Sequence, residues 1–185
     1  AHLFDHGKIV NVVTEDLHLE MPTDDERPLA DRLAELGIFP VVVNEINADN
    51  IGHLVNDKTW GLALNAIWIF SREVIDLFGG RLFNYHNARL PEERGAAAYT
   101  WKILRGQHEA RLTIHDLTPE LDEGDVRMAL EFDMPFGIQA DIYERMRPLE
   151  ELLLRNWAAE CEEGGNFPRI VQNHAESGYF PRLNT

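Results

Sequence analysis

Short blocks of hydrophobic and polar residues alternate along the chain, and their periods are of two kinds. Runs of β-branched and apolar residues predict strands, whereas apolar residues spaced three and four apart predict helices. Strands are expected over residues 8–14, 41–43, 60–69, 81–86, 111–117 and 126–134. Helices are expected over residues 28–37, 48–56, 71–77, 96–105 and 139–161. This alternation predicts an α/β fold with a doubly wound, mostly parallel, Rossmann-like sheet flanked by helices.

The length of 185 residues suits one domain with a full hydrophobic core. We place this domain at residues 1–165 and expect an irregular tail over residues 166–185, which are rich in Pro and Asn. An acidic surface loop is expected over residues 15–27, and the apolar run at 60–69 predicts a strand buried on both faces. The apolar stripe of the last helix predicts packing against the core rather than a partner-binding surface.

The charge balance argues against nucleic acid and membrane partners. Lys and Arg number 17 against 32 Asp and Glu, which gives a net charge of -15, and no local basic cluster offsets it. Such a surface repels phosphate backbones and acidic membranes. The single cysteine, Cys161, can form neither an intrachain disulfide nor a zinc-ligand pair, and no apolar run approaches the roughly 20 residues of a transmembrane helix. These features predict a cytoplasmic protein.

Several standard motifs are missing from the sequence. It contains no G-x-G-x-x-G, no Walker A loop and no G-x-S-x-G elbow, and the pair His108-Glu109 lacks the second histidine of a zinc peptidase. Dinucleotide, ATP and zinc chemistry are therefore not predicted, and we expect no metal. His115 lies inside an expected strand, and we interpret it as a hydrogen-bonded structural histidine.

The stretch RLFNYHNARLPEERG, residues 81–95, combines a strand with an unusual polar loop. Asn84 and His86 are two residues apart, so the period of a strand turns both side chains to one face. The loop that follows contains Leu90-Pro91 and ends at Gly95, residues that suit a fixed turn. We expect Arg94 to be structural and to tie this loop through carboxylates or backbone carbonyls.

Asn84, His86 and Asp122 are the candidate catalytic residues, because they lie at the ends of two different expected strands. An amide and a charged imidazole can donate hydrogen bonds to a developing oxyanion, and a carboxylate can take a proton from an amine. The trio therefore suits acyl transfer to an amine. The alternative interpretation is conformational, since Asn and Asp are common in turns.

Two stretches of the sequence resemble the folate-dependent formyltransferase family. They are NYHNARLPEERGAAAYTW, residues 84–101, and RLTIHDLTPELDEGD, residues 111–125. Members of this family share Asn-x-His followed by Leu-Pro-x-x-Arg-Gly, and a downstream Thr-x-His that leads to an Asp-x-Gly turn. The resemblance covers roughly residues 38–134 and is closest to the branch of sugar N-formyltransferases and methionyl-tRNA formyltransferases.

The resemblance implies that residues 1–165 form a formyltransferase catalytic domain in which Asn84, His86 and Asp122 are catalytic. It also implies 10-formyltetrahydrofolate as the formyl donor, with no metal. In this family the pterin pocket is built mainly from backbone at two places in the fold. By resemblance the matching residues are Trp68, Ile69, Phe70, Leu117, Thr118 and Pro119.

The expected acceptor is a primary amine on a nucleotide-linked amino sugar. The tail YFPRLNT resembles the closing segment of the sugar- and methionyl-tRNA-modifying branch, and the net charge of -15 disfavours transfer RNA. Arg89 is the candidate for a contact to the acceptor's phosphate. The alternatives are glycinamide ribonucleotide, methionyl-tRNA, or a non-catalytic folate- or partner-binding domain of the same fold. The expected partner is thus a small-molecule amine, with a homodimer left open.

The chain departs from the family pattern at three places. Asn87-Ala88 stands where the family usually has Pro-Ser, so a hydroxyl near the acceptor is lost, and Arg111 replaces a common glycine. The segment AHLFDHG, residues 1–7, does not read as the family's first strand, so we expect that strand to be lacking.

Overall fold

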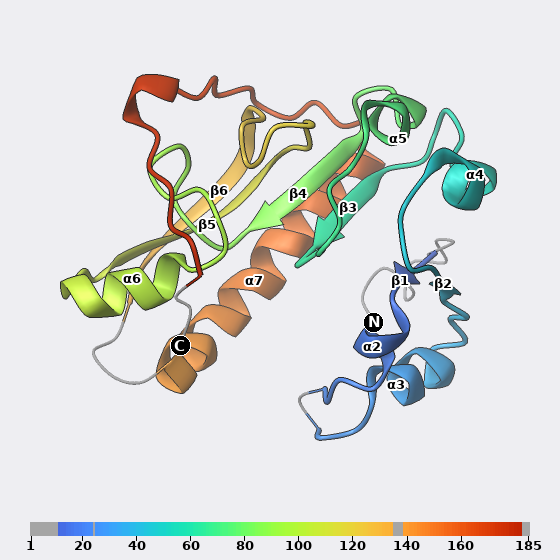
Figure 1. Ribbon diagram of the computed structural model, residues 1–185, viewed down its shortest axis with the longest axis horizontal. Helices are drawn as coiled ribbons and strands as arrows, with labels where there is room; N and C mark the ends of the chain where they lie inside the picture. The colour runs from blue at the N-terminus through green and yellow to red at the C-terminus, as the bar shows by residue number, and fades with distance from the viewer. Residues whose placement is uncertain (1–10, 24, 135–138, 183–185) are drawn as a thin grey trace. The chain divides into compact units, whose positions relative to one another are not determined.

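The computed structural model describes residues 11–23, 25–134 and 139–182. The chain divides into two compact units, residues 1–58 and residues 59–185, which Figure 1 draws from blue to red. The expectation that the family's first strand is lacking falls on residues 1–7, which lie outside the described residues.

The first unit contains short elements. Its two strands pair in parallel, with Val13 opposite Val41. Pro28 precedes the longest helix, and Gly37 follows it with a φ of 69°. The elements of this unit are β1 (Val13–Thr14), α2 (Asp16–Leu19), α3 (Leu29–Glu35), β2 (Val41–Val42), α4 (Ala48–Ile51) and the 3-10 helix η1 (Gly52–Leu54).

Two expectations for this unit needed refinement. The acidic segment 15–27 was expected as a loop, but it contains the short helix α2. The helix expected over 48–56 begins where predicted, because the side chains and backbones of Asn47 and Asn50 form a reciprocal capping box. It tightens into η1 at Gly52, where helix propensity is poor.

The second unit is built on a four-stranded sheet with the order β3-β4-β5-β6. Strands β3 and β4 are parallel, whereas β5 runs antiparallel to both β4 and β6. The elements of this unit are β3 (Gly61–Leu64), α5 (Arg72–Leu77), β4 (Leu82–His86), α6 (Ala98–Arg105), β5 (Glu109–Asp116), β6 (Val126–Asp133), α7 (Gln139–Glu162) and the 3-10 helix η2 (His174–Glu176).

The predicted α/β class with flanking helices is confirmed, but the sheet is mixed where mostly parallel strands were expected. The reason is visible in Figure 1: α6 lies beyond the end of β4 instead of crossing back along the sheet. The chain therefore re-enters the sheet at the end where β4 leaves it, and β5 runs opposite to β4.

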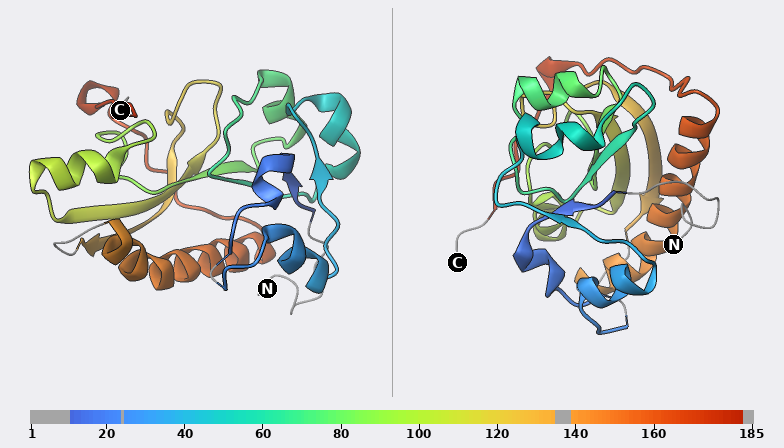
Figure 2. Two further views of the ribbon diagram at one scale, coloured as in Figure 1. Left: turned by 60° about the horizontal axis from the view of Figure 1, so that its bottom comes forward. Right: turned by 90° about the vertical axis from the view of Figure 1, so that its right-hand side faces the viewer.

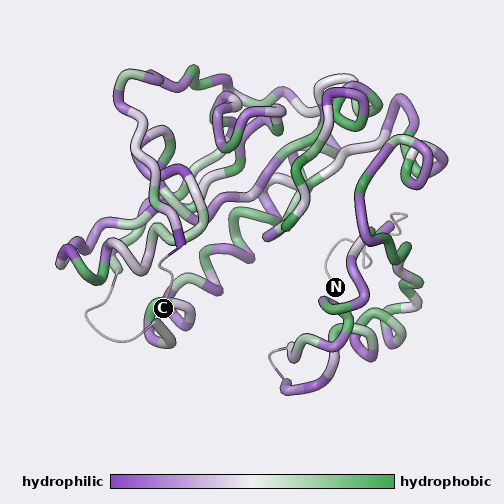
Figure 3. Tube along the Cα trace, viewed as in Figure 1, coloured by the Kyte–Doolittle hydropathy of each residue, from purple (hydrophilic) through white to green (hydrophobic). Residues whose placement is uncertain are grey.

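Helix α7 covers one face of this sheet, and both views in Figure 2 place α5 on the other side. The hydropathy of α7 alternates along its trace, as Figure 3 shows, because one side of the helix is buried. Its buried stripe confirms the predicted core packing. The core joins Phe83 and Tyr85 of β4, Ala110, Leu112 and Ile114 of β5, Phe132 of β6, and Ile142, Met146, Leu153 and Trp157 of α7.

The strand expected over 60–69 is wrong in its length and its burial. It ends at Leu64, because Asn65 adopts a φ of 50° that is incompatible with extended backbone. Beyond it, Ile67 and Ile69 are exposed, the latter by 86%. The run is apolar, but most of it is not part of the sheet.

The segment after α7 is irregular, as predicted. Within its described part, residues 166–182, the regular elements are η2 and isolated bridges that join Ile170 to Val126 and Tyr179 to Arg94. This segment is therefore fastened to the sheet and to the loop after β4. The division of the chain at residue 165 stays a prediction. No helix in the described parts of the chain is long and apolar enough to cross a membrane.

Candidate active site

Strands β4 and β5 carry polar side chains on the face opposite the core cluster. In the antiparallel register, Asn84 lies opposite His115 and His86 lies opposite Thr113. The residues between them, such as Tyr85 and Ile114, belong to the core under α7. Because successive side chains of a strand point to opposite faces, the polar candidate residues lie on one face of the sheet and the core residues on the other.

The loop after β4 is held close to this polar face. The hydroxyl of Thr113 donates to the backbone carbonyl of Ala88 at 2.7 Å. The ring Nε2 of His86 lies 2.8 Å from the carbonyl of Glu93. Since a carbonyl oxygen only accepts hydrogen bonds, Nε2 carries the proton and donates. His86 is thereby fixed in one ring orientation, with Nδ1 on the opposite side.

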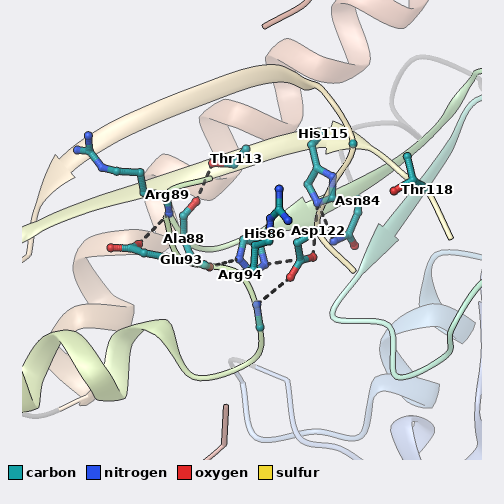
Figure 4. A network of polar contacts seen from close by, with 12 residues as sticks. Asn84, His86, Ala88, Arg89, Glu93, Arg94, Thr113, His115, Thr118 and Asp122 are labelled. Carbon is teal, nitrogen blue, oxygen red and sulfur yellow. Dashed lines mark hydrogen bonds and ion pairs between the residues drawn. The ribbon is translucent and has the colours of Figure 1, made fainter. Parts of the chain in front are cut away.

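The acidic turn after β5 brings Asp122 to the same place, as Figure 4 shows. Asp122 has a φ of 54°, and its Oδ2 accepts a hydrogen bond of 2.9 Å from the amide of Gly95. Gly124 is pressed against β5, because a Cβ there would lie 1.8 Å from the carbonyl oxygen of Asp116. These contacts place Oδ1 of Asp122 3.8 Å from Nδ1 of His86.

His115 lies between Asn84 and Asp122 and contacts both. Its Nδ1 donates to the carbonyl of Asp116 at 2.8 Å, so Nε2 accepts from Nδ2 of Asn84 at 3.1 Å. Oδ1 of Asp122 lies 3.7 Å from the same Nε2. Burial, and then the nearby His86, lower the pKa of His115 to about 4. The desolvation of the ring outweighs the attraction of Asp122, and His115 is neutral at pH 7.

The structure therefore brings together Asn84, His86 and Asp122, which the sequence analysis singled out. They form one polar network through His115, which was expected to be a hydrogen-bonded structural histidine. The signal for its place in the network was the register of β4 and β5, which the sequence does not contain. Each role in catalysis stays a prediction.

Arg94 ties the loop after β4, as predicted, through one carboxylate and two further side chains. Nη1 contacts Glu123 at 2.8 Å, and Nη2 donates to the side chains of Gln172 at 3.0 Å and His174 at 2.9 Å. Gln172 in turn donates to the carbonyls of Asp122 and Gly124. The buried guanidinium thus fastens the loop after β4 to the acidic turn and to the C-terminal segment.

A shallow cleft of about 310 Å³ lies beside Arg94 and Glu123. Its walls come from the acidic turn and from the segment after η2. The lining residues are Arg94, Leu121, Glu123, Ser177, Gly178 and Tyr179.

Arg89 does not converge with the trio. Its side chain points away from Asn84, His86 and Asp122 in Figure 4. Its Nη2 lies 3.6 Å from a carboxylate oxygen of Glu109 and 3.4 Å from one of Glu131. The contact to an acceptor phosphate stays a prediction, and any such contact would compete with these carboxylates.

The two segments predicted to hold the pterin leave the sheet at different points. The segment with Trp68, Ile69 and Phe70 follows β3, whose last residue pairs with Tyr85 near the end of β4. The segment with Leu117, Thr118 and Pro119 follows β5, and the amide of Leu117 donates to the carbonyl of Leu82 at 3.0 Å, at the start of β4. Phe70 is buried, whereas Ile69 is exposed. A folate-binding role for these residues stays a prediction.

In the part of the chain that the structure describes, no group of three or more His, Cys, Asp or Glu side chains is arranged to hold a metal ion.

Comparison of the sequence with known proteins finds formyltransferases. A family model described as formyl transferase matches residues 63–154, which include Asn84, His86 and Asp122. The methionyl-tRNA formyltransferase of Clostridioides difficile (strain 630) is 32% identical over 117 residues, which is 63% of this chain and 38% of that protein. The resemblance inferred from the sequence motifs is thereby confirmed.

Two solved structures share the fold. An N-formyltransferase from Helicobacter canadensis, in complex with folinic acid and dTDP-3-aminofucose, aligns with a TM-score of 0.78 and 21% identity over 98% of this chain and 65% of that one. The sugar 3N-formyl transferase WlaRD, in the presence of dTDP and 5-N-formyl-THF, aligns with a TM-score of 0.74 and 19% identity over 94% of this chain and 60% of that one. This chain thus spans less than two thirds of each of these relatives.

Arg94→Lys is expected to lower the free energy of unfolding by about 1–3 kcal/mol, since a lysine cannot reproduce the planar fork that reaches three acceptors. Urea denaturation measures the change. Arg155→Lys is the control, because Arg155 forms an exposed pair with Glu151 on α7 and its replacement should change stability by less than about 0.5 kcal/mol. Equal effects of the two substitutions would contradict the structural role of Arg94.

His115 is expected to make stability depend on pH. Its pKa is lowered from 6.5 to about 4 in the folded chain, so between these values the unfolded chain binds a proton that the folded chain does not. Stability is therefore fully present above about pH 6.5 and is lost as the pH falls toward 4, by roughly 3 kcal/mol. Urea midpoints across this range should fall less in His115→Gln, whose amide can still donate and accept. An equal fall in both proteins would exclude His115 as the titrating group.

Proposed function

We propose that this chain, whose residues 63–154 match the formyl transferase family model, transfers a formyl group from 10-formyltetrahydrofolate to a primary amine. The observation that carries the proposal is the convergence of Asn84, His86 and Asp122 on one face of the sheet, within the network closed by His115. An amide, an imidazole and a carboxylate around one point are the groups that acyl transfer to an amine requires.

In this proposal Asn84 and His86 stabilise negative charge. Attack of the amine nitrogen on the formyl carbon places charge on the formyl oxygen. His86 has Nε2 engaged by the carbonyl of Glu93, so the charged ring would donate to that oxygen through Nδ1. Asn84 donates one amide hydrogen to His115 and keeps a second N–H for the same purpose.

Asp122 takes the proton that the attacking amine must lose. Its Oδ2 is engaged by the amide of Gly95, and its Oδ1 faces both His86 and His115. The proton is then delivered to the nitrogen of the folate as its bond to the formyl carbon breaks. The amine becomes a formamide and the folate becomes tetrahydrofolate, so atoms and protons balance.

Nucleotide-linked amino sugars are the acceptors that we propose. One supporting fact is that the Helicobacter canadensis structure of the same fold is a complex with dTDP-3-aminofucose. A second is the net charge of -15, which disfavours transfer RNA. The similarity to a methionyl-tRNA formyltransferase keeps methionyl-tRNA as an alternative, together with glycinamide ribonucleotide.

Asn84→Ala, His86→Ala and Asp122→Ala are each expected to lower kcat by roughly 10²-fold or more, the usual cost of removing a preorganised donor or base. The readout is release of tetrahydrofolate from 10-formyltetrahydrofolate in the presence of amine. His53→Ala, a substitution at an exposed histidine of the first unit, is the control and should keep wild-type kcat. A trio variant that also kept it would lose its assigned role. Folate binding without turnover in the wild type would favour the non-catalytic domain.

The acceptor is tested by competition among a dTDP-linked amino sugar, glycinamide ribonucleotide and methionyl-tRNA at equal concentrations. We expect the sugar to be preferred by tenfold or more in kcat/KM, a ratio that measures transition-state discrimination. A preference of that size for either other amine would overturn the sugar assignment and leave the formyl chemistry intact.

A further inference from the structure

Glu93 and Lys102 form a buried ion pair beside the candidate site. Nζ of Lys102 contacts Oε1 of Glu93, and both side chains are at least nine-tenths buried. The two residues come from different elements, Glu93 from the loop after β4 and Lys102 from the buried side of α6. A buried pair of this kind is costly to desolvate and is often no more stabilising than a well-packed apolar pair. Its presence in this loop therefore calls for another explanation.

Both residues of the pair form further hydrogen bonds. Oε2 of Glu93 accepts from the amide of Arg89 at 2.9 Å, while the amide of Glu93 donates to the carbonyl of Arg89 at 2.7 Å. The loop is thus closed twice between these two residues, once by backbone and once by the carboxylate. Lys102 also donates to the carbonyl of Glu109 at 2.7 Å, which anchors it to the start of β5.

The carbonyl of Glu93 is the acceptor that holds Nε2 of His86 at 2.8 Å. The position of this carbonyl therefore determines that Nε2 of His86 carries a proton. It also determines that Nδ1 faces Asp122. The side chain of Glu93 fixes it through Arg89, and Lys102 supplies the counter-charge that allows a carboxylate to be buried there.

We propose that Glu93 is a positioning residue for His86, with Lys102 as its buried counter-charge. The carboxylate closes the loop of residues 89–93 and aims the Glu93 carbonyl at Nε2, so that Nδ1 is presented to the reacting centre. This inference rests on the proposed function for its effect on turnover, but the ring orientation that it predicts does not depend on formyl transfer.

Two double variants separate positioning from mere packing. Glu93→Gln with Lys102→Met removes both charges but keeps an amide oxygen that can accept from Arg89. Glu93→Leu with Lys102→Met removes both charges and the acceptor. We expect both to fold, since apolar groups of similar volume commonly replace a buried ion pair without loss of stability. A purely structural pair would make the two variants behave alike.

The first readout is the NMR signal of the hydrogen-bonded Nε2 proton of His86, assigned by its loss in His86→Gln. We expect it in the wild type and in the Gln-Met variant, and we expect it to be lost or averaged in the Leu-Met variant. The second readout is kcat, which should stay within about threefold of wild type for Gln-Met and fall about tenfold or more for Leu-Met, with the KM for folate unchanged. Glu92→Gln, a change at the neighbouring glutamate of the same loop, is the control and should change neither readout.

Absence of the Nε2 proton signal from the wild type, its loss from the Gln-Met variant, or its retention together with full kcat in the Leu-Met variant would each overturn the proposal. Should the Leu-Met variant fail to fold, the wild-type and Gln-Met spectra can still overturn the proposal. Should the chain transfer no formyl group at all, the proposed function fails while the NMR readout continues to test the positioning of His86.

Discussion

The hydrogen bond from the amide of Gly95 to the carboxylate of Asp122 is the contact on which the rest of the site depends. It joins the loop after β4 to the turn after β5, next to the Arg94–Glu123 pair, which joins the same two segments. Both residues need left-handed backbone, Gly95 at a φ of 96° and Asp122 at 54°. A side chain at Gly95 would also meet the carbonyl of Phe180 at 2.8 Å. We therefore expect substitutions at Gly95 or Asp122, or a shift of the backbone at Phe180, to disturb this contact.

Several charged and polar side chains are buried next to the contact between Gly95 and Asp122. His86, Glu93, Arg94 and Asp122 are all buried beside it, and the cost of desolvation requires a partner for each. Arg94 finds its partners in the acidic turn and in the C-terminal segment, and Glu93 finds its counter-charge on α6. The network consequently draws in elements far apart in the sequence, and it explains why the irregular segment after α7 returns to the sheet.

Much of the fold could be predicted from periodicity, because helices and strands with one buried face leave a clear pattern. The helix at α7 and the strands at β5 and β6 were placed to within two residues. Strand direction could not be predicted, since the pattern is the same for parallel and antiparallel pairs. The strand predicted over 60–69 was wrong because a single residue, Asn65, leaves the extended region of backbone conformation. The hydrophobicity of a segment does not reveal such a change of backbone conformation.

In the site, the catalytic trio could be named from motifs. The Glu93–Lys102 pair could not, since two charged residues nine positions apart are usually interpreted as surface residues.

The polar face and the core are coupled through the register of β5. Between Ile114 and His115 the pairing with β6 shifts by one residue, and the extra residue, Arg127, binds both carboxylate oxygens of Asp116. Asp116 also provides the carbonyl that accepts the Nδ1 proton of His115. This carbonyl determines the tautomer of His115, and the acceptor nitrogen Nε2 in turn orients the amide of Asn84. The hydrogen bond within β5 thus leaves one N–H of Asn84 for the proposed chemistry.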